Sequence, residues 1–202
     1  LVPLEDDRYE IRLRGPNVMR GYLDNLKASS EAFDEQGCFI TGDAARFHDP
    51  EDPSKGLAYA GRLVEEFKLN SGTWVRSGAV RAQLLAALSP LASDVLLCGI
   101  NENYLAALLV PNATAIAEVL GEDARTAGGS PMEHPQLRAM LAERLAAYNA
   151  ENPGNSSTIR RLAFMERLPD PQRHEISDKG TINQRIAALY AAEPSAAVLC
   201  VD

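Results

Sequence analysis

The sequence of 202 residues has few cysteines and no long apolar stretch. Its three cysteines, Cys38, Cys98 and Cys200, are odd in number and far apart. This argues against a disulfide framework and favours a reducing compartment such as the cytoplasm. No apolar run approaches the roughly 20 residues that a membrane-spanning helix requires. We therefore expect no membrane span.

The chain also lacks an excess of positive charge. It carries 20 basic and 28 acidic residues, which gives a formal net charge of −8. Such a chain cannot bind nucleic acid through broad electrostatic attraction, so we expect no nucleic-acid partner. An anionic ligand would have to be held by a few local donors. The three histidines show no metal-ligand spacing, so we predict no metal site within this chain.

Lysine is scarce, because 16 of the 20 basic residues are arginine. Only Lys68 and Lys179 remain after residue 66, among ten arginines. A compact ammonium can act as a point charge in a crowded site, a role that a guanidinium fills poorly. The two lysines are therefore candidate site residues. Chance could also leave only two lysines in this part of the chain. The motifs around each lysine must therefore show whether it has a functional role.

The rest of the composition is that of a folded protein, with 46% hydrophobic and 24% charged residues. Residues 1–62 read as short strands and turns without a full core. Polar and apolar residues alternate over 10–14, and a strand over 37–42 leads into a glycine turn that presents Asp43. A further short strand is predicted over 57–60.

The pattern changes after Arg62. Asn70-Ser71-Gly72, between short apolar segments, predicts a hairpin. Helical and strand patterns then alternate, which predicts a small mixed α/β (α+β) domain. We expect strands over 95–98, 105–110 and 159–167, and helices over 80–88, 112–119, 137–148 and 182–190.

Four segments carry a more specific signal. They are EIRLRGPNVMRGY (10–22), FITGD (39–43), GRLVEEFKLNSG (61–72) and EISDKGTI (175–182). In this order and spacing they resemble the last third of the adenylate-forming enzymes, a family of acyl-CoA synthetases, aryl-CoA ligases, luciferases and peptide-synthetase adenylation domains. The resemblance covers essentially the whole chain. The spacing from Lys68 to Gly72, the following Thr-Trp-Val and the stretch ISDKGTINQR look most like feruloyl-CoA synthetases.

The resemblance implies a domain organisation and an activity. Residues 1–62 would be the end of a large N-terminal adenylation domain, 63–66 a hinge, and 67–202 a mobile C-terminal domain. The chain would be the C-terminal fragment of an ATP-dependent acid–CoA ligase, which converts a carboxylate, ATP and coenzyme A to acyl-CoA, AMP and pyrophosphate. The implied acid is aromatic, such as ferulate.

The resemblance also implies partners and cofactors. ATP or AMP, coenzyme A and Mg are the expected cofactors, with the Mg site upstream of this chain. The family's glycine-rich phosphate loop is not recognisable here, so we expect the isolated chain to be inactive. Its partner would be the missing N-terminal domain of the same protein.

The resemblance also implies a role for each of several individual residues. Asp43 would accept hydrogen bonds from ribose hydroxyls, and Arg62 would donate to ribose or phosphate oxygens, with Tyr59 packed near the nucleotide. Val64 would be the hinge residue, where many relatives carry Asp or Lys.

The remaining site residues belong to the second part. Lys68 would face the site during thioester formation, and Gly72 would let coenzyme A approach the backbone closely, with Ser71 and Trp74 beside it. Trp74 could instead simply pack. Lys179 would stabilise charge during adenylate formation. If this segment is aligned with the family's C-terminal motif on Gly180, Thr181 takes the position of the family's lysine. Both alignments, with Lys179 or with Thr181 at that position, remain open.

Two alternative functions remain beside the ligase. A non-catalytic descendant could serve as an interaction or regulatory module, which the displaced lysine would allow. An acyl-adenylating enzyme could also use an acceptor other than coenzyme A. An intact phosphate loop upstream would favour an enzyme over the module.

Overall fold

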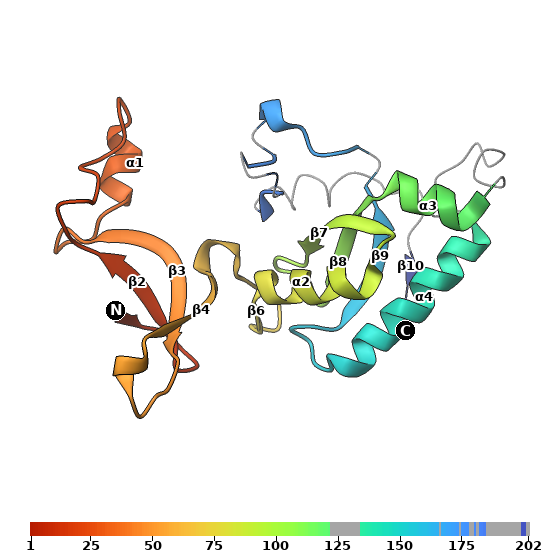
Figure 1. Cartoon of the computed structure of the whole chain (residues 1–202), viewed down its shortest axis with the longest axis horizontal. Helices are drawn as coiled ribbons and strands as arrows, with labels where there is room; N and C mark the ends of the chain where they lie inside the picture. The colour runs from red at the N-terminus through yellow and green to blue at the C-terminus, as the bar shows by residue number, and fades with distance from the viewer. Residues whose placement is uncertain are drawn as a thin grey trace. The chain divides into compact units, whose positions relative to one another are not determined.

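The computed structural model describes residues 1–121, 134–165, 167–173, 175–177, 180, 182–184 and 199–200 (Figure 1). The chain divides into two compact units, Leu1–Val64 and Glu65–Asp202. The division falls inside the segment 63–66, which carries a short 3₁₀ helix, Leu63–Glu65.

Unit 1 is a four-stranded antiparallel sheet in the order β1-β2-β3-β4. Its strands are β1 (Val2–Pro3), β2 (Tyr9–Leu13), β3 (Phe39–Phe47) and β4 (Leu57–Arg62). A short helix α1 (Leu26–Glu31) lies between β2 and β3 and begins after Asn25, whose side chain accepts a hydrogen bond from the N–H of Ala28. A 3₁₀ turn, Pro53–Lys55, joins β3 to β4.

Unit 1 buries few large apolar side chains. Among its residues, the buried apolar ones are Ala44 and Ala45, which are 0% and 1% exposed. Leu23 and Leu26 are 92% and 89% exposed. This agrees with the sequence, which predicts short strands without a full core.

Strand β3 corrects one expectation about the turn before Asp43. The strand does not end at Gly42 but continues through Asp43 to Phe47. Gly42 takes a positive φ of 70°, and the pairing registers of β3 are irregular at this point. A bulge absorbs the glycine while Ala45, Arg46 and Phe47 continue to pair with β4.

Unit 2 is built on a sheet in the order β10-β9-β8-β7. β7 is antiparallel to β8, β9 is parallel to β8, and β10 is antiparallel to β9. The strands are β7 (Ala92–Cys98), β8 (Leu105–Pro111), β9 (Ile159–Phe164) and β10 (Leu199–Cys200). The helices are α2 (Ser77–Leu88), α3 (Ala113–Leu120) and α4 (Pro135–Glu151).

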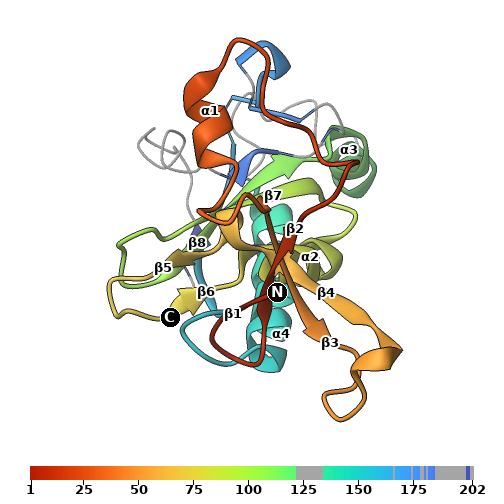
Figure 2. The ribbon, with the colours of Figure 1, turned by 90° about the vertical axis from the view of Figure 1, so that its left-hand side faces the viewer.

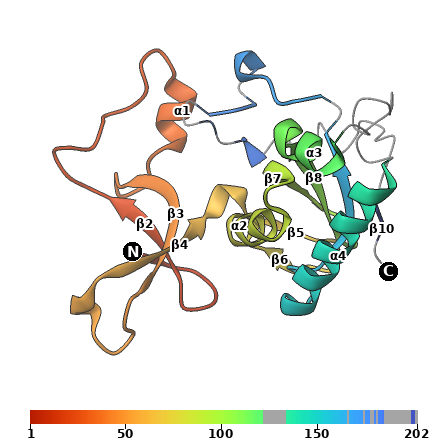
Figure 3. The same ribbon diagram turned by 45° about the vertical axis from the view of Figure 1, so that its right-hand side comes forward.

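The helices of unit 2 pack on one face of this sheet (Figure 3). Leu84 of α2, Leu141 of α4 and Leu109 of β8 are each fully buried in the shared core. Burying such side chains stabilises a fold by about 1.5–3 kcal/mol each. On the other face, Leu96 packs with Met165 and Ile182. The mixed α/β fold expected from the sequence is therefore confirmed.

The predicted elements of unit 2 hold with a few differences in extent. Asn112 caps α3 as expected, because its side chain accepts a hydrogen bond from the N–H of Ala115 at 3.3 Å. β9 ends at Phe164 rather than at residue 167. The helix expected over 182–190 lies mostly outside the described residues. Ile182 forms an isolated antiparallel bridge with Ile176 instead of starting a helix.

Two further observations concern the cysteines and the membrane. Cys38 and Cys98 are free thiols, and burial raises the pKa of Cys98 to about 11. Within the part of the chain that the structure describes, no helix combines the length and apolar character needed to cross a membrane.

Candidate functional site

Asp43 and Arg62 face each other across two neighbouring strands. They are direct partners in the pairing of β3 with β4. The Arg62 Nε lies 3.3 Å from Asp43 Oδ1, and the two side chains are 50% and 36% exposed. The structure thus brings together the two residues expected to hold a nucleotide and leaves both within reach of a ligand.

Thr41 connects this pair to the rest of the sheet. Its hydroxyl donates to the carbonyl oxygen of Ile11 at 2.6 Å and accepts from the Asp43 N–H at 3.1 Å. Its own carbonyl oxygen accepts from Arg62 Nη2 at 3.5 Å. Thr41 was not among the site residues predicted from the sequence. The signal was present, because a threonine hydroxyl two residues before another N–H commonly forms such a local bond.

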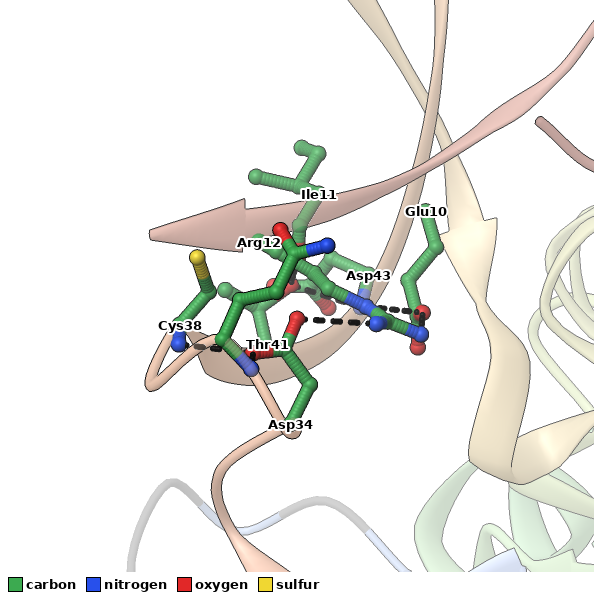
Figure 4. Close-up of polar contacts among 8 residues, drawn as sticks. Glu10, Ile11, Arg12, Asp34, Cys38, Thr41 and Asp43 are labelled. Carbon is green, nitrogen blue, oxygen red and sulfur yellow. Dashed lines mark hydrogen bonds and ion pairs between the residues drawn. The ribbon is translucent and has the colours of Figure 1, made fainter. Parts of the chain in front are cut away.

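A second polar group braces β2 against the turn that precedes β3 (Figure 4). The guanidinium of Arg12 lies 2.7 Å from Glu10 Oε2 and 2.9 Å from Asp34 Oδ2. The other Asp34 oxygen accepts from the N–H of Cys38 at 2.8 Å. This N–H and then Arg12 lower the pKa of Asp34. This group could not be predicted from the sequence, because Arg12 and Asp34 are 22 residues apart in the chain.

Tyr59 lies on β4 opposite Ala45 and is 66% exposed. We expected this side chain to pack near the nucleotide. Its exposure shows that it does not pack into the sheet of unit 1. Two thirds of the side chain surface is therefore open to solvent.

A second set of predicted residues gathers on the hairpin of β5 (Phe67–Lys68) and β6 (Trp74–Val75), which run side by side in Figure 2. Lys68 pairs with Trp74, and its ammonium lies 4.7 Å from the centre of the indole ring. Trp74 is 45% exposed. The tryptophan therefore supports the lysine through a cation–π contact rather than packing in the core.

Gly72 and Ser71 occupy the tip of this hairpin. Gly72 has a φ of 82°, and a Cβ built there would meet no atom within 4 Å. The conformation requires glycine, and the space beside it is open. The Ser71 hydroxyl lies 2.9 Å from the hydroxyl of Thr73. The Lys68 carbonyl accepts from the N–H of Asn101 at 3.2 Å, which braces the hairpin from the neighbouring turn.

Val64 lies in the 3₁₀ helix at the unit boundary and is 44% exposed. Lys179 and Thr181 lie outside the described residues, so the choice between their registers stays a prediction. The residues that flank them are described. Glu175 is 3% exposed and accepts two hydrogen bonds from Arg167, at 2.9 and 3.2 Å.

Gln184, which follows these positions in the sequence, is held by the backbone of β7. It is 6% exposed and bonds the backbone of Leu97 twice, accepting from its N–H at 3.3 Å and donating to its carbonyl at 2.5 Å. Glu175 and Gln184 are thus each held by hydrogen bonds to other residues of unit 2. Among the described residues, no group of three or more His, Cys, Asp or Glu is arranged to hold a metal.

Comparison with protein-family models finds no match. Among curated proteins, a 2-succinylbenzoate–CoA ligase of Bacillus licheniformis is 28% identical over 160 residues, which are 79% of this chain and 27% of the ligase. A carboxylic acid reductase of Segniliparus rugosus is 28% identical over 128 residues, which are 62% of this chain and 10% of the reductase. The chain therefore spans less than a third of the length of either relative.

The fold also matches solved structures. The adenylation domain of the Segniliparus rugosus reductase, solved with AMP and a co-purified carboxylic acid, superposes with a TM-score of 0.67 at 22% identity. The match covers 91% of this chain and 27% of that domain. In sequence and in fold, the relatives of this chain are the adenylate-forming acid and acyl-CoA ligases.

Proposed function

We propose that this chain is the C-terminal part of an ATP-dependent acid–CoA ligase. The observation that carries the proposal is the Asp43–Arg62 pair, which is exposed and stands at the positions where the family motifs expect nucleotide contacts. The relatives support the same class of enzyme, and each is longer than this chain.

In the first half-reaction, a carboxylate oxygen attacks the α-phosphorus of ATP and pyrophosphate leaves. The Asp43 carboxylate accepts hydrogen bonds from the ribose hydroxyls, and charge makes such bonds short and strong. Arg62 offers a planar set of donors to ribose or phosphate oxygens. Lys179 places its ammonium near the charge that develops at the α-phosphate. Mg would be held upstream of this chain.

In the second half-reaction, the thiolate of coenzyme A attacks the acyl carbon and AMP leaves, after the thiol has lost its proton. The hairpin of unit 2 presents Lys68 and the open space at Gly72 to this step. Segment 63–66, around Val64, acts as the hinge that turns residues 67–202 between the two half-reactions. The large domain that ends with residues 1–62 is the partner.

We further propose an aromatic acid such as ferulate as substrate, from the spacing of Lys68 and Gly72 and the ISDKGTINQR stretch. A second candidate differs in the acceptor. Because one relative is a carboxylic acid reductase, the acyl-adenylate could pass to a group other than coenzyme A.

The test uses the full-length protein that includes this chain. Hydroxycinnamic, benzoic and fatty acids are offered one at a time, and exchange of labelled pyrophosphate into ATP is measured, followed by thioester formation with coenzyme A. Acid-dependent exchange followed by thioester supports the ligase, with the largest rate for a hydroxycinnamate. Exchange without thioester supports the second candidate. A folded protein that neither exchanges pyrophosphate nor binds AMP contradicts both.

A further inference from the structure

Strand β3 loses its regular pairing at the three residues that include Asp43. Glu10 pairs with Ala44 and Arg12 pairs with Ile40. Three residues of β3, Thr41 to Asp43, therefore stand opposite the single residue Ile11 of β2. On the other side, the register of β3 with β4 shifts between Asp43 and Ala45. The regular ladder is interrupted where the nucleotide residue stands.

The side chain of Thr41 replaces the missing ladder contacts. Its hydroxyl donates to the carbonyl of Ile11, the residue that the register skips, and accepts from the N–H of Asp43. One hydroxyl thus uses its proton and a lone pair to join β2 to the backbone of Asp43. The Thr41 carbonyl also accepts from Arg62, so both members of the pair contact this residue.

Gly42, which lies between Thr41 and Asp43, explains why the hydrogen bonds of the Thr41 hydroxyl matter. Gly42 has a φ of 70° and little conformational restraint of its own. Its neighbour Val64 lies 3.3 Å from where a Cβ would stand, so a bulkier and stiffer residue would meet that side chain. Without the Thr41 hydroxyl, the backbone at Asp43 would keep its pairing with Arg62 but lose its tie to β2.

We propose that Thr41 is a positioning residue of the nucleotide site, whose hydroxyl fixes the direction in which Asp43 presents its carboxylate to the ribose. This inference rests on the proposed function, because it assumes that Asp43 binds ribose hydroxyls. Thr41 acts through Asp43 and makes no contact with the reacting atoms.

The test compares the affinity of the full-length protein for AMP and for 2′,3′-dideoxy-AMP by calorimetry. The ratio of the two dissociation constants reports on the contact with the ribose hydroxyls. A general loss of stability would weaken the binding of both nucleotides equally and leave the ratio unchanged. We expect the wild-type protein to prefer AMP by about tenfold or more, the usual effect of hydrogen bonds to a charged group. Thr41→Val, which removes the hydroxyl and keeps the shape, should bring the ratio close to one.

Three further variants make the result decisive. Thr41→Ser restores the hydroxyl and should restore the preference for AMP. Thr41→Ala also removes the hydroxyl, with a smaller side chain, and is used if the Thr41→Val protein does not fold. Thr158→Val removes a hydroxyl that bonds a turn carbonyl in unit 2, at 3.3 Å from Asn152, and should leave the ratio unchanged.

The outcomes separate this inference from the proposed function. A wild-type ratio in folded Thr41→Val or Thr41→Ala overturns the positioning role. Loss of the ratio in Thr41→Ser as well shows that the hydroxyl is not the cause and also overturns it. Asp43→Asn is measured in the same series. If it keeps the wild-type preference for AMP, the nucleotide site itself is misplaced and the proposed function loses its main support.

Discussion

At the scale of single residues, unit 1 is held by charged contacts where a core of large side chains would normally serve. Arg12 joins Glu10 and Asp34, whose side chains are 13% and 14% exposed. Asp34 also accepts from two backbone N–H groups, those of Gln36 and Cys38. Its carboxylate closes the turn before β3, the strand that carries Thr41 and Asp43.

The first prediction concerns the pH dependence of this contact. The folded-state pKa of Asp34 is lowered, chiefly by the N–H of Cys38 and then by Arg12. Its contribution to stability is therefore complete above the unfolded pKa of about 3.9 and is lost as the pH falls through the lower folded value. Thermal melts should show Asp34→Asn less stable than wild type from pH 7 to pH 5, with a gap that narrows below about pH 3.9.

Asp24→Asn is the matched control, because Asp24 is an exposed carboxylate of the same unit with a φ of 51°, which asparagine also adopts. Its melting temperature should follow wild type at every pH. A gap for Asp34→Asn that widens on acidification would mean that the carboxylate does not stabilise the fold.

At the scale of elements, unit 2 ties Gln184, in the described segment 182–184, to an edge strand. β7 stands at the end of the sheet order, and Gln184 bonds both backbone groups of Leu97 on that strand. A buried N–H that loses its acceptor carries a free-energy penalty of about 1–3 kcal/mol. The amide of Gln184 therefore holds this residue against β7.

The second prediction tests this tie. Gln184→Met keeps the length of the side chain and removes both hydrogen bonds. The amide of Leu97 should then exchange with solvent at least about tenfold faster, because its acceptor is gone. Amide exchange measured by NMR reads this directly. The amide of Ala107, which lies on the central strand β8, is the internal control and should keep its rate. Unchanged exchange at Leu97 would contradict the tie.

Several of these elements could be predicted from sequence, and the reason is local. The hairpin around Gly72 and the cap of α3 at Asn112 depend on neighbouring residues, so their signals lie within a few positions. The course of β3 through Gly42 could not be predicted, because glycine signals a turn unless the pairing strands on both sides are known. The contact of Gln184 with Leu97 spans 87 residues and leaves no local signal.

Part of the candidate site could likewise be predicted from the sequence, and part of it could not. Motif positions placed Asp43 and Arg62, and the pairing of β3 with β4 brings them together. The cation–π contact of Lys68 with Trp74 was missed because it depends on which residues of the hairpin pair. The specific acid remains a proposal, because the residues that the motifs identify are ones for which we propose contacts with the nucleotide and the acceptor, not with the acid.

At the scale of the whole molecule, the proposed enzyme places its two lysines in unit 2 and its nucleotide pair in unit 1. Lys68 lies on the β5–β6 hairpin, and Lys179 lies in sequence between the bridged residues Ile176 and Ile182. We propose that a mobile domain presents these two segments to the nucleotide in turn. The half-reactions should then depend on different lysines.

The third prediction separates the half-reactions in the full-length protein. Lys179→Ala should lower the rate of pyrophosphate exchange by about 10²–10³, the usual effect of losing one preorganised charge, and leave thioester formation from supplied acyl-adenylate largely intact. Lys68→Ala should do the reverse. Lys27→Ala changes a lysine that is 86% exposed and should alter neither rate.

Thr181 decides between the two registers in the same assay. If Thr181→Ala lowers pyrophosphate exchange and Lys179→Ala does not, the register aligned on Gly180 is correct. Equal loss of both half-reactions in both lysine variants would contradict the alternation of faces.

The central claim is that Asp43 holds the nucleotide of an adenylate-forming enzyme. The measurement that tests it most directly is the dissociation constant of AMP for the full-length protein, for wild type, Asp43→Asn and Asp24→Asn. We predict that Asp43→Asn weakens AMP binding by about 10–100-fold, as expected for lost hydrogen bonds to a charged acceptor, while Asp24→Asn binds as wild type. AMP affinity that is equal in Asp43→Asn and wild type, with both proteins folded, would contradict the account.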